Sequence, residues 1–412
     1  MDFQEQQQKL SPEQRRAAFL DASPKHDYEI SKKVADGCYL VRRKADNALF
    51  LGEPVLDAGW RARDADGTLR RMLHRGAGEP VAGLLNHENL VSVAARVDGL
   101  AFDGQAGAQD EHLLLWDFCD RGTLRTLVAE PPVRPTAAGF LPESLCWHVA
   151  LSLLRALAWL HQGVRERLLA EGEEAVVVEL GPREREDVAA EAYAAEDDWL
   201  PVLHRELTPR NVWFQAPRGT ETYGLCKLGN FGSAVVAGHA SGSGAGRIVT
   251  TWRGDPPLET MRQRMDMEKT DQLPNEERPY TDGTELWCLG HILYLMMSGR
   301  SLIPLQPHEC NQCRCRHMNT SGATCKERHD ADAAMLQAAV GSLNDYTQGL
   351  RSLTVALLMG YHRDTVWRAD YALRMARGWC RRWRRTTSAG KIYVDLEDDE
   401  RLRARNRAAG IA

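Results

Sequence analysis

The chain has 412 residues, of which 26% are charged and 43% are hydrophobic, and its formal net charge is -5. This composition is typical of a globular protein with a sizeable core, built as one large domain or as two lobes. The acidic balance argues against nucleic acid and anionic membranes as partners. No apolar run reaches the ~18 to 20 residues of a membrane-spanning helix, and the polar start MDFQEQQQKL lacks the apolar core of a secretory signal. We therefore expect a cytoplasmic or nuclear protein whose ten cysteines are reduced.

The N-terminal part of the chain predicts mostly β-strands. Residues 1–27 are a polar extension, and after them short apolar runs alternate with turn residues such as Ala45-Asp46-Asn47. The expected strands lie at 39–43, 49–55, 87–97 and 111–119. A helix is expected at about 69–85. Together these elements predict a small β-rich lobe over residues 28–116.

After Phe140 the hydrophobic period becomes helical. The run PESLCWHVALSLLRALAWLH (142–161) predicts an amphipathic helix, whereas 285–299 is apolar nearly all round and predicts a buried one. Two further helices are expected at 350–359 and 370–385, the last with a solvated basic face. Strands first and helices afterwards predict an α+β architecture. The helical lobe covers 117–385, and 386–412 is expected to be a flexible, charged tail.

Two insertions interrupt the helical lobe. Residues 166–198 hold twelve acidic side chains against three basic ones, which predicts a solvated insertion, with an acidic docking surface as the alternative. Residues 308–329 are rich in cysteine and histidine. They lie between two expected helices, where an insertion leaves the core intact.

Two segments carry the most specific signal. The strings PVLHRELTPRNVWF (201–214) and KLGNFGSA (227–234) resemble the catalytic loop and the metal-binding loop of eukaryotic protein kinases. Four other landmarks follow the order of that family: HENLV (87–91), LLLWDFCDRGTL (113–124), GDPPLE (254–259) and TELWCLGHILYLMMSG (284–299). The resemblance covers about residues 28–385, and within the superfamily the chain is most similar to NIMA-related Ser/Thr kinases. It implies a bilobal fold, with a β-rich N-lobe hinged onto a helical C-lobe.

Phosphoryl transfer by this family depends on charges that hold a triphosphate and its magnesium in place. The segment that corresponds to the glycine-rich loop keeps only Gly37. The lysine that grips the phosphates corresponds to Gly52 or Glu53, and a glutamate there repels them. No lysine occurs from 45 to 226. The lysines that could reach in from a neighbouring strand are Lys32, Lys33 and Lys44.

The catalytic loop keeps its frame but changes its chemistry. By resemblance, Arg205 is retained, Glu206 replaces the catalytic aspartate, and Thr208 replaces a lysine that steadies the transferring phosphate. Asn211 remains as a magnesium ligand, whereas Asn230 replaces the aspartate of the metal-binding loop. Magnesium prefers hard anionic oxygen ligands, so this last change weakens the site.

The nucleotide cleft also differs from the family pattern. Trp116 corresponds to the gatekeeper position and Trp213 to the small residue that floors the adenine pocket. Asp117 and Cys119 fall at the hinge. The aspartate that supports the catalytic loop from the buried helix corresponds to Glu285.

These departures predict a pseudokinase that acts as a scaffold or a regulatory binding module for protein partners, with weak or absent binding of ATP and magnesium. One alternative is a weakly active ATP-dependent Ser/Thr kinase in which Glu206 is the base and Asn211 and Asn230 hold one magnesium. Another is a nucleotide sensor that binds ATP without transferring phosphate. The substitutions leave all three open, and they favour the first.

The segment 308–329 suggests a metal. Cys310-x-x-Cys313 and Cys325-x-x-x-His329 have the spacing of a structural zinc site. Two further usable ligands in the same segment are Cys315 and His317. Reduced thiols in a surface loop and a disulfide are the other interpretations. The six remaining cysteines are scattered, and we expect them in the core.

Overall fold

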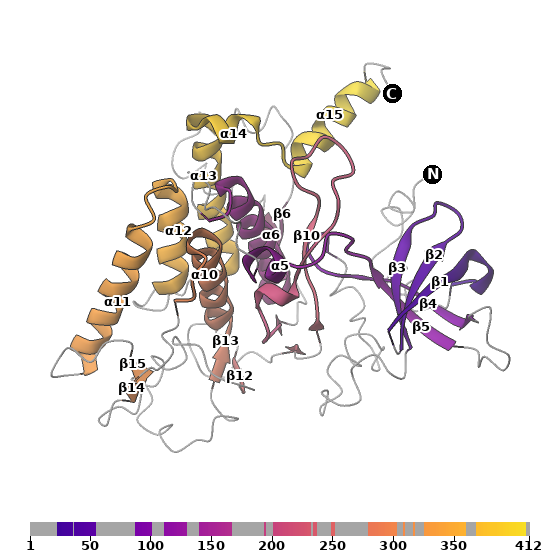
Figure 1. Cartoon of the computed structure of the whole chain (residues 1–412), viewed down its shortest axis with the longest axis horizontal. Coiled ribbons are helices and arrows are strands. Elements are labelled where there is room, and N and C mark those ends of the chain that lie inside the picture. Colours follow the sequence, from indigo (N-terminus) through magenta and orange to yellow (C-terminus); the bar gives the residue numbers. More distant parts are fainter. Residues whose placement is uncertain are drawn as a thin grey trace. The chain divides into compact units, whose positions relative to one another are not determined.

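The computed structural model is drawn in Figure 1. It describes residues 23–35, 37–54, 87–100, 111–129, 140–166, 193–194, 201–231, 234–236, 249–251, 279–302, 308–309, 316–317, 325–359 and 368–408. The chain forms two compact units. Unit 1 comprises Met1–Asp120 and Lys227–Val236, and unit 2 comprises Arg121–Cys226 and Ala237–Ala412. Within the described ranges, every helix is too short or too polar to cross a lipid bilayer.

Unit 1 is built on a five-stranded antiparallel sheet with the order β1-β2-β3-β5-β4. The bounds are β1 (Tyr28–Ala35), β2 (Cys38–Arg43), β3 (Leu49–Pro54), β4 (Val93–Leu100) and β5 (Glu111–Asp117), preceded by the short helix η1 (Lys25–Asp27). The predicted hairpin and the two later strands are confirmed. The helix expected at about 69–85 lies outside the described residues.

One face of this sheet forms the core of unit 1. Because side chains alternate along a strand, residues two apart share a face. Val41, Phe50, Leu113 and Leu115 lie on the same buried face, together with Tyr28, whose ring meets Phe50 edge to face. Two short strands follow later in the chain, β10 (Cys226–Leu228) and β11 (Val235–Val236).

Unit 2 is helical and is organised around α6 (Glu143–Gln162). The other helices are α5 (Leu124–Ala129), α10 (Asp282–Ser298), α11 (Cys325–Gly341), α12 (Gln348–Met359), α13 (Ala369–Thr386), α14 (Ser388–Ile392) and α15 (Leu396–Ala408). The short elements are β6 (Arg165–Glu166), β7 (Tyr193–Ala194), β8 (Val202–Leu203), η3 (Pro209–Asn211), β9 (Val212–Phe214), β12 (Val249–Thr251), β13 (Pro279–Thr281), β14 (His308–Glu309) and β15 (Arg316–His317). The mixed α+β class is thereby confirmed.

The long helix α6 differs from its prediction. The sequence predicts an amphipathic helix, but α6 is buried on nearly every side, because α13, α10 and α12 all pack against it. Leu145 to His161 are buried throughout except for Arg155. The helix ends at Gly163, whose φ of 63° is the left-handed conformation that favours glycine.

The predicted buried helix is α10. The side chains of Thr281 and Thr284 form a reciprocal capping box at its start. Gly290 lets α12 approach closely, since a Cβ at this position would lie 2.9 Å from Leu358 Cγ. The helices expected at 350–359 and 370–385 are confirmed as α12 and α13.

The two ends of the acidic insertion are joined by a short antiparallel pair. Arg165 of β6 pairs with Ala194 of β7, and Glu166 pairs with Tyr193. Most of the insertion lies outside the described residues. The two ends therefore meet, as expected of a segment inserted between neighbouring points of a fold.

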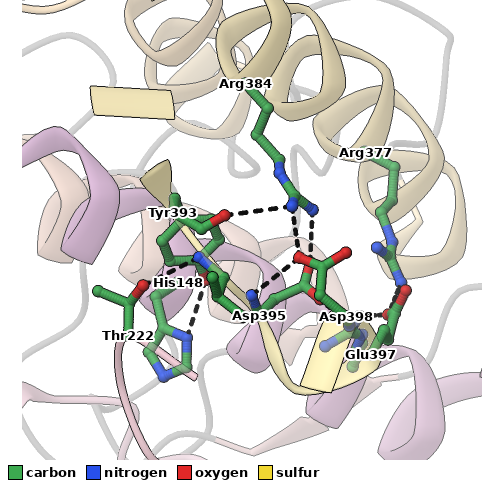
Figure 2. A network of polar contacts seen from close by, with 10 residues as sticks. His148, Thr222, Arg377, Arg384, Tyr393, Asp395, Glu397 and Asp398 are labelled. Carbon is green, nitrogen blue, oxygen red and sulfur yellow. Dashed lines mark hydrogen bonds and ion pairs between the residues drawn. The ribbon is translucent and has the colours of Figure 1, made fainter. Parts of the chain in front are cut away.

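The C-terminal residues were expected to form a flexible tail, but most of them are helical. Residues 388–392 and 396–408 form α14 and α15, and the connection between these helices is held by arginines of the helical core (Figure 2). Arg384 of α13 binds Asp395 Oδ2 at 2.9 Å and also pairs with Asp398. Glu397 accepts from Arg377 and from Arg155 of α6. Part of the predicted basic face of α13 is thus neutralised by the segment that follows it.

Tyr393 anchors the same segment through its ring. It is 4% exposed, and it lies against Trp383, with ring centroids 5.7 Å apart, and beside Tyr223. Val394 exchanges hydrogen bonds with Thr222, as Figure 2 shows in part. Aromatic burial and ion pairs together fix this segment on unit 2.

Candidate functional site

The loop that resembles a catalytic loop lies in unit 2, directly after β8. His204 is fully buried, and Arg205 has a φ of 62°, a left-handed conformation that is costly for a residue with a side chain. Asn211 Nδ2 donates to the carbonyl of Glu206 at 2.7 Å. These contacts hold the predicted residues His204, Arg205, Glu206 and Asn211 together in one loop. Strain of this kind persists only where surrounding contacts fix the backbone.

Glu285 of α10 is the anchor of this loop. It is fully buried; Oε1 accepts from the backbone N–H of Arg205 at 2.7 Å, and Oε2 lies 2.6 Å from His161 Nε2. Burial alone would raise the pKa of Glu285, but the hydrogen bond and charge of His161, helped by His204 and the Arg205 amide, lower it overall. An ionised carboxylate therefore supports the loop, as the resemblance implies for this position.

β9 continues the loop and is braced by the segment before α5. Phe214 N donates to the carbonyl of Gly122 at 2.9 Å, and Arg121 N donates to the carbonyl of Phe214 at 3.0 Å. Trp213 lies half-buried between these contacts and pairs antiparallel with Thr123. The predicted adenine-floor residue is thus held by its backbone in unit 2.

β3 of unit 1 distinguishes Gly52 from Glu53, the two residues that the resemblance offers for the lysine position. A Cβ on Gly52 would lie 2.8 Å from Val41 Cγ2 and 3.3 Å from Leu113 Cδ1, so Gly52 belongs to the packed core face. Glu53 is on the opposite face and pairs with Leu114 of β5. Of the two alternatives from the sequence, only Glu53 is free of the core.

Glu53 lies in surroundings that disfavour its charge. Burial raises the pKa of Glu53, and the nearby Trp116 indole offsets part of that rise. Trp116 is 9% exposed, and its Nε1 has no hydrogen-bond partner among the described residues. Burial and the negative charge of Glu53 also raise the pKa of Cys38. Cys38, Glu53 and Trp116 therefore form a face that has no fixed cation from the part of the chain that the structure describes.

Lys227 is the lysine that sequence reasoning missed. Its Nζ is buried and binds Asp117 Oδ2 at 2.9 Å and the carbonyl of Leu90 at 3.1 Å, so its charge is neutralised inside unit 1. Asp117 also accepts from Ser92 N, and its own N–H donates to the carbonyl of Ser92. The predicted hinge residue Asp117 thus serves a structural ion pair. Its partner is 110 residues away in sequence, and no local pattern indicates it.

The three lysines that could replace the missing cation are all exposed: Lys32, Lys33 and Lys44. Gly37, the single glycine of the expected phosphate loop, has a φ of 68° in the two-residue connection between Ala35 and Cys38. Such a short connection is typical of a tight hairpin rather than of a loop that wraps a phosphate.

Two other predicted residues are described by their backbone. Asn230 has a φ of 66° and is exposed, directly before the buried Phe231. Asn tolerates this left-handed conformation better than most residues.

Cys119 is half-buried and is not in a disulfide. Of the six scattered cysteines expected in the core, Cys146, Cys226 and Cys380 are fully buried, and the other three are partly exposed.

The predicted zinc ligands are only partly described. Cys310 and Cys313 lie outside the described residues, whereas Cys325 is the first residue of α11 and His329 lies one turn later. Within the described part of the chain, no three His, Cys, Asp or Glu side chains are placed to hold a metal ion. The described residues thus supply at most one half of the predicted set.

Comparison with protein-family models and with curated proteins found no match to this chain. The structure itself establishes an α+β protein with a five-stranded antiparallel sheet in one unit and a helical second unit.

Proposed function

We propose that this chain is a degenerate member of the protein-kinase superfamily, with a bilobal fold, that acts as a scaffold or regulatory binding module. The order of elements supports this assignment: a β-sheet unit comes first, and a helical unit follows with a strained loop tied to a buried helix. The residues in this loop and helix are the ones that the resemblance identifies from the sequence. A kinase-like fold without the charged groups that phosphoryl transfer needs favours a binding role.

Glu53 is the observation that carries the proposal. At the position where the family has its phosphate-gripping lysine stands a carboxylate, on a face whose Trp116 indole is buried. Two like charges about 4 Å apart repel by ~1 kcal/mol in water and more in a protein interior. Lys227, which is buried in the same unit, is held by Asp117. The described residues therefore do not fit a magnesium–triphosphate complex.

The loop around Glu206 favours one alternative, a weakly active Ser/Thr kinase. Its backbone is anchored by Glu285, and Asn211 is fixed against the carbonyl of Glu206. A carboxylate remains at the base position, but with one extra methylene its reach is wrong by about 1 Å, a misplacement that can cost ~100-fold in rate. We therefore rank this activity below the binding role.

A thermal-shift titration tests the proposal. Full-length protein is titrated with ATP to millimolar concentration, with and without magnesium. The proposal predicts no shift in Tm under either condition. A magnesium-dependent rise in Tm, together with phosphate incorporation that Glu206→Ala abolishes, would establish the kinase instead. A rise in Tm without phosphate transfer would identify a nucleotide sensor.

A further inference from the structure

The buried and exposed residues of α13 lie on opposite sides of the helix. Buried residues such as Ala376 and Trp383 face α6 and α12, against which the helix packs. Five exposed residues lie on the other side, within about 100° of one another at 3.6 residues per turn. These residues form the arginine stripe: Tyr371, Gly378, Arg381, Arg382 and Arg385.

The rest of unit 2 leaves charge on this stripe unneutralised. Arg382 and Arg385 make no side-chain hydrogen bond or ion pair with any residue that the structure describes. Arg385 follows Arg381 by four residues and Arg382 by three, and like charges at these spacings on a helix repel each other. A bound anion would remove this repulsion, so the stripe favours a negatively charged partner.

Gly378 lies in the middle of the stripe. A Cβ at this position would meet no atom within 4 Å, so packing within the described chain does not require a glycine here. Glycine inside a helix is less stable than alanine, but it lets another backbone approach closely. Tyr371, two turns earlier, is 45% exposed, and the Arg374 guanidinium lies 6.0 Å from its ring centroid. The stripe thus combines charge with an open surface and an exposed ring.

The flank of the same helix shows which chemistry α13 binds. Arg384 pairs with Asp395, and Arg377 pairs with Glu397, as Figure 2 shows. The ring of Tyr393, from the same acidic segment, is buried against unit 2. The C-terminal segment is therefore a short acidic stretch with one buried ring, held by arginines of α13. The arginine stripe offers similar groups on a side of the helix that this segment leaves exposed.

The length of the stripe limits the size of the partner segment. From Tyr371 to Arg385 it extends ~21 Å along the helix axis, the length of about six or seven residues of extended chain. The net charge of -5 repels a long polyanion such as nucleic acid. A short acidic peptide is affected mainly by charges within the ~8 Å Debye length, and here these include the arginines. Of the five residues of the stripe, Tyr371 is the one aromatic ring, whereas sites for single-stranded nucleic acid stack successive bases on several rings.

We propose that the arginine stripe of α13 binds an acidic segment of a partner protein, extended along the helix. Arg381, Arg382 and Arg385 pair with its carboxylates, Gly378 lets its backbone approach, and Tyr371 packs against an apolar side chain. This inference rests on the proposed function, since it gives the binding module a surface and a class of partner. The stripe shares no residue with the kinase-like motifs, so its failure and a failure of the ATP titration are distinguishable.

Fluorescence anisotropy with the full-length protein tests the proposal. The probe is a labelled peptide of about seven residues, EDDLEDE, which matches the stripe in length, and its neutral counterpart is QNNLQNQ. At low salt we expect the acidic peptide to bind with a Kd on the order of 10 µM and the neutral peptide not to bind. Added salt should weaken binding, because exposed charges are screened. No binding of the acidic peptide, or equal binding of both peptides, would overturn the proposal.

Charge reversals locate the binding surface. Arg382→Glu and Arg385→Glu are each expected to weaken binding at least about fivefold without lowering Tm, because both side chains are exposed. Arg300→Glu, at an exposed position of the same unit, makes the same change of charge and is the matched control. It is expected to leave Kd unchanged. Equal weakening by all three variants would indicate attraction by net charge alone and would overturn the proposal.

A variant of unchanged charge tests close contact. Gly378→Leu fills the open surface and is expected to weaken peptide binding at least about fivefold, while Tm is kept or raised because the helix loses a glycine. An unchanged Kd would contradict the proposed contact.

Other occupants of the stripe are tested separately. Tighter binding of a labelled single-stranded DNA than of the acidic peptide would assign the stripe to nucleic acid and overturn the proposal. Self-association in sedimentation that Arg385→Glu abolishes would assign it to a second copy of the chain and would also overturn it.

Discussion

The loop at 204–214 and strand β3 differ in different ways from the pattern of the family that they resemble. In the loop, the residue that supports the backbone has the charge type that the resemblance implies: Glu285 is a carboxylate and binds the Arg205 N–H. On β3, Glu53 carries a charge opposite to that of the lysine that the resemblance implies at this position. Contacts that hold the fold together are needed whether or not chemistry takes place, whereas charges aimed at a ligand are not. This difference favours a protein whose role depends on its folded structure and not on phosphoryl transfer.

The largest expected effect is at Glu285. Glu285→Leu removes a buried carboxylate and leaves the Arg205 N–H and His161 without their partner, so we expect a loss of about 3–5 kcal/mol of unfolding free energy. Glu206→Ala, in the same loop but half-buried, should cost less than about 1 kcal/mol. Urea denaturation of both variants makes the comparison. Equal losses would mean that Glu285 does not anchor the loop.

The pH dependence of stability gives a second view of Glu285. Its pKa is lowered in the folded protein from the ordinary value of 4.5. The ionised form is therefore favoured on folding, and the stabilisation is present above pH 4.5 and is lost as the pH falls through the folded pKa. Glu285→Gln should flatten the acid side of the stability curve, measured by Tm from pH 7 to pH 3. A curve that matches the wild type would contradict this.

Packing on β3 should give the next effect. Gly52→Ala places a methyl group 2.8 Å from Val41 Cγ2, and overpacking of a core costs about 1–3 kcal/mol. The control is Gly378→Ala on α13, where a Cβ would have open space and the helix should gain about 0.5–1 kcal/mol. Opposite shifts in Tm are expected. If Gly52→Ala were neutral, the assignment of Glu53 to the non-core face would fail.

The C-terminal ion pairs should give a smaller effect. Arg384→Ala removes bonds to Asp395, Asp398 and the carbonyl of Tyr393. Because Arg384 is partly exposed, we expect a loss of about 1–2 kcal/mol, reduced by salt. The exposed neighbour Arg385, changed to alanine, should have almost no effect. Limited proteolysis should release residues 388–412 faster from the first variant only, and equal cleavage rates would argue against this anchor.

The smallest effect is expected at Glu53. Burial raises its pKa in the folded protein above the ordinary 4.5, so ionisation opposes folding and stability falls as the pH rises through that range. Glu53→Gln should therefore raise Tm at pH 7 and make little difference below pH 4. A lower Tm at pH 7 would indicate that a cation outside the described residues pairs with Glu53.

Much of the fold follows from local patterns, and most of the site does not. Alternation and turn residues predict β2 and β3, and helical periodicity predicts α10, α12 and α13. Sequence alone leaves Gly52 and Glu53 as alternatives for the lysine position that the resemblance implies. Only the packing of β2 and β5 against Gly52 distinguishes the two residues, and that packing involves residues far from β3 in sequence. The pairing of Lys227 with Asp117, like the order of the C-terminal helices, depends on residues far apart in the chain. Such contacts have no signal in a single sequence.

We propose that Glu53 prevents the binding of a triphosphate on its face of β3. Isothermal titration calorimetry of magnesium–ATP into the full-length protein tests it most directly. We predict no saturable heat up to millimolar nucleotide. Saturable, magnesium-dependent binding by the wild-type protein would contradict the account.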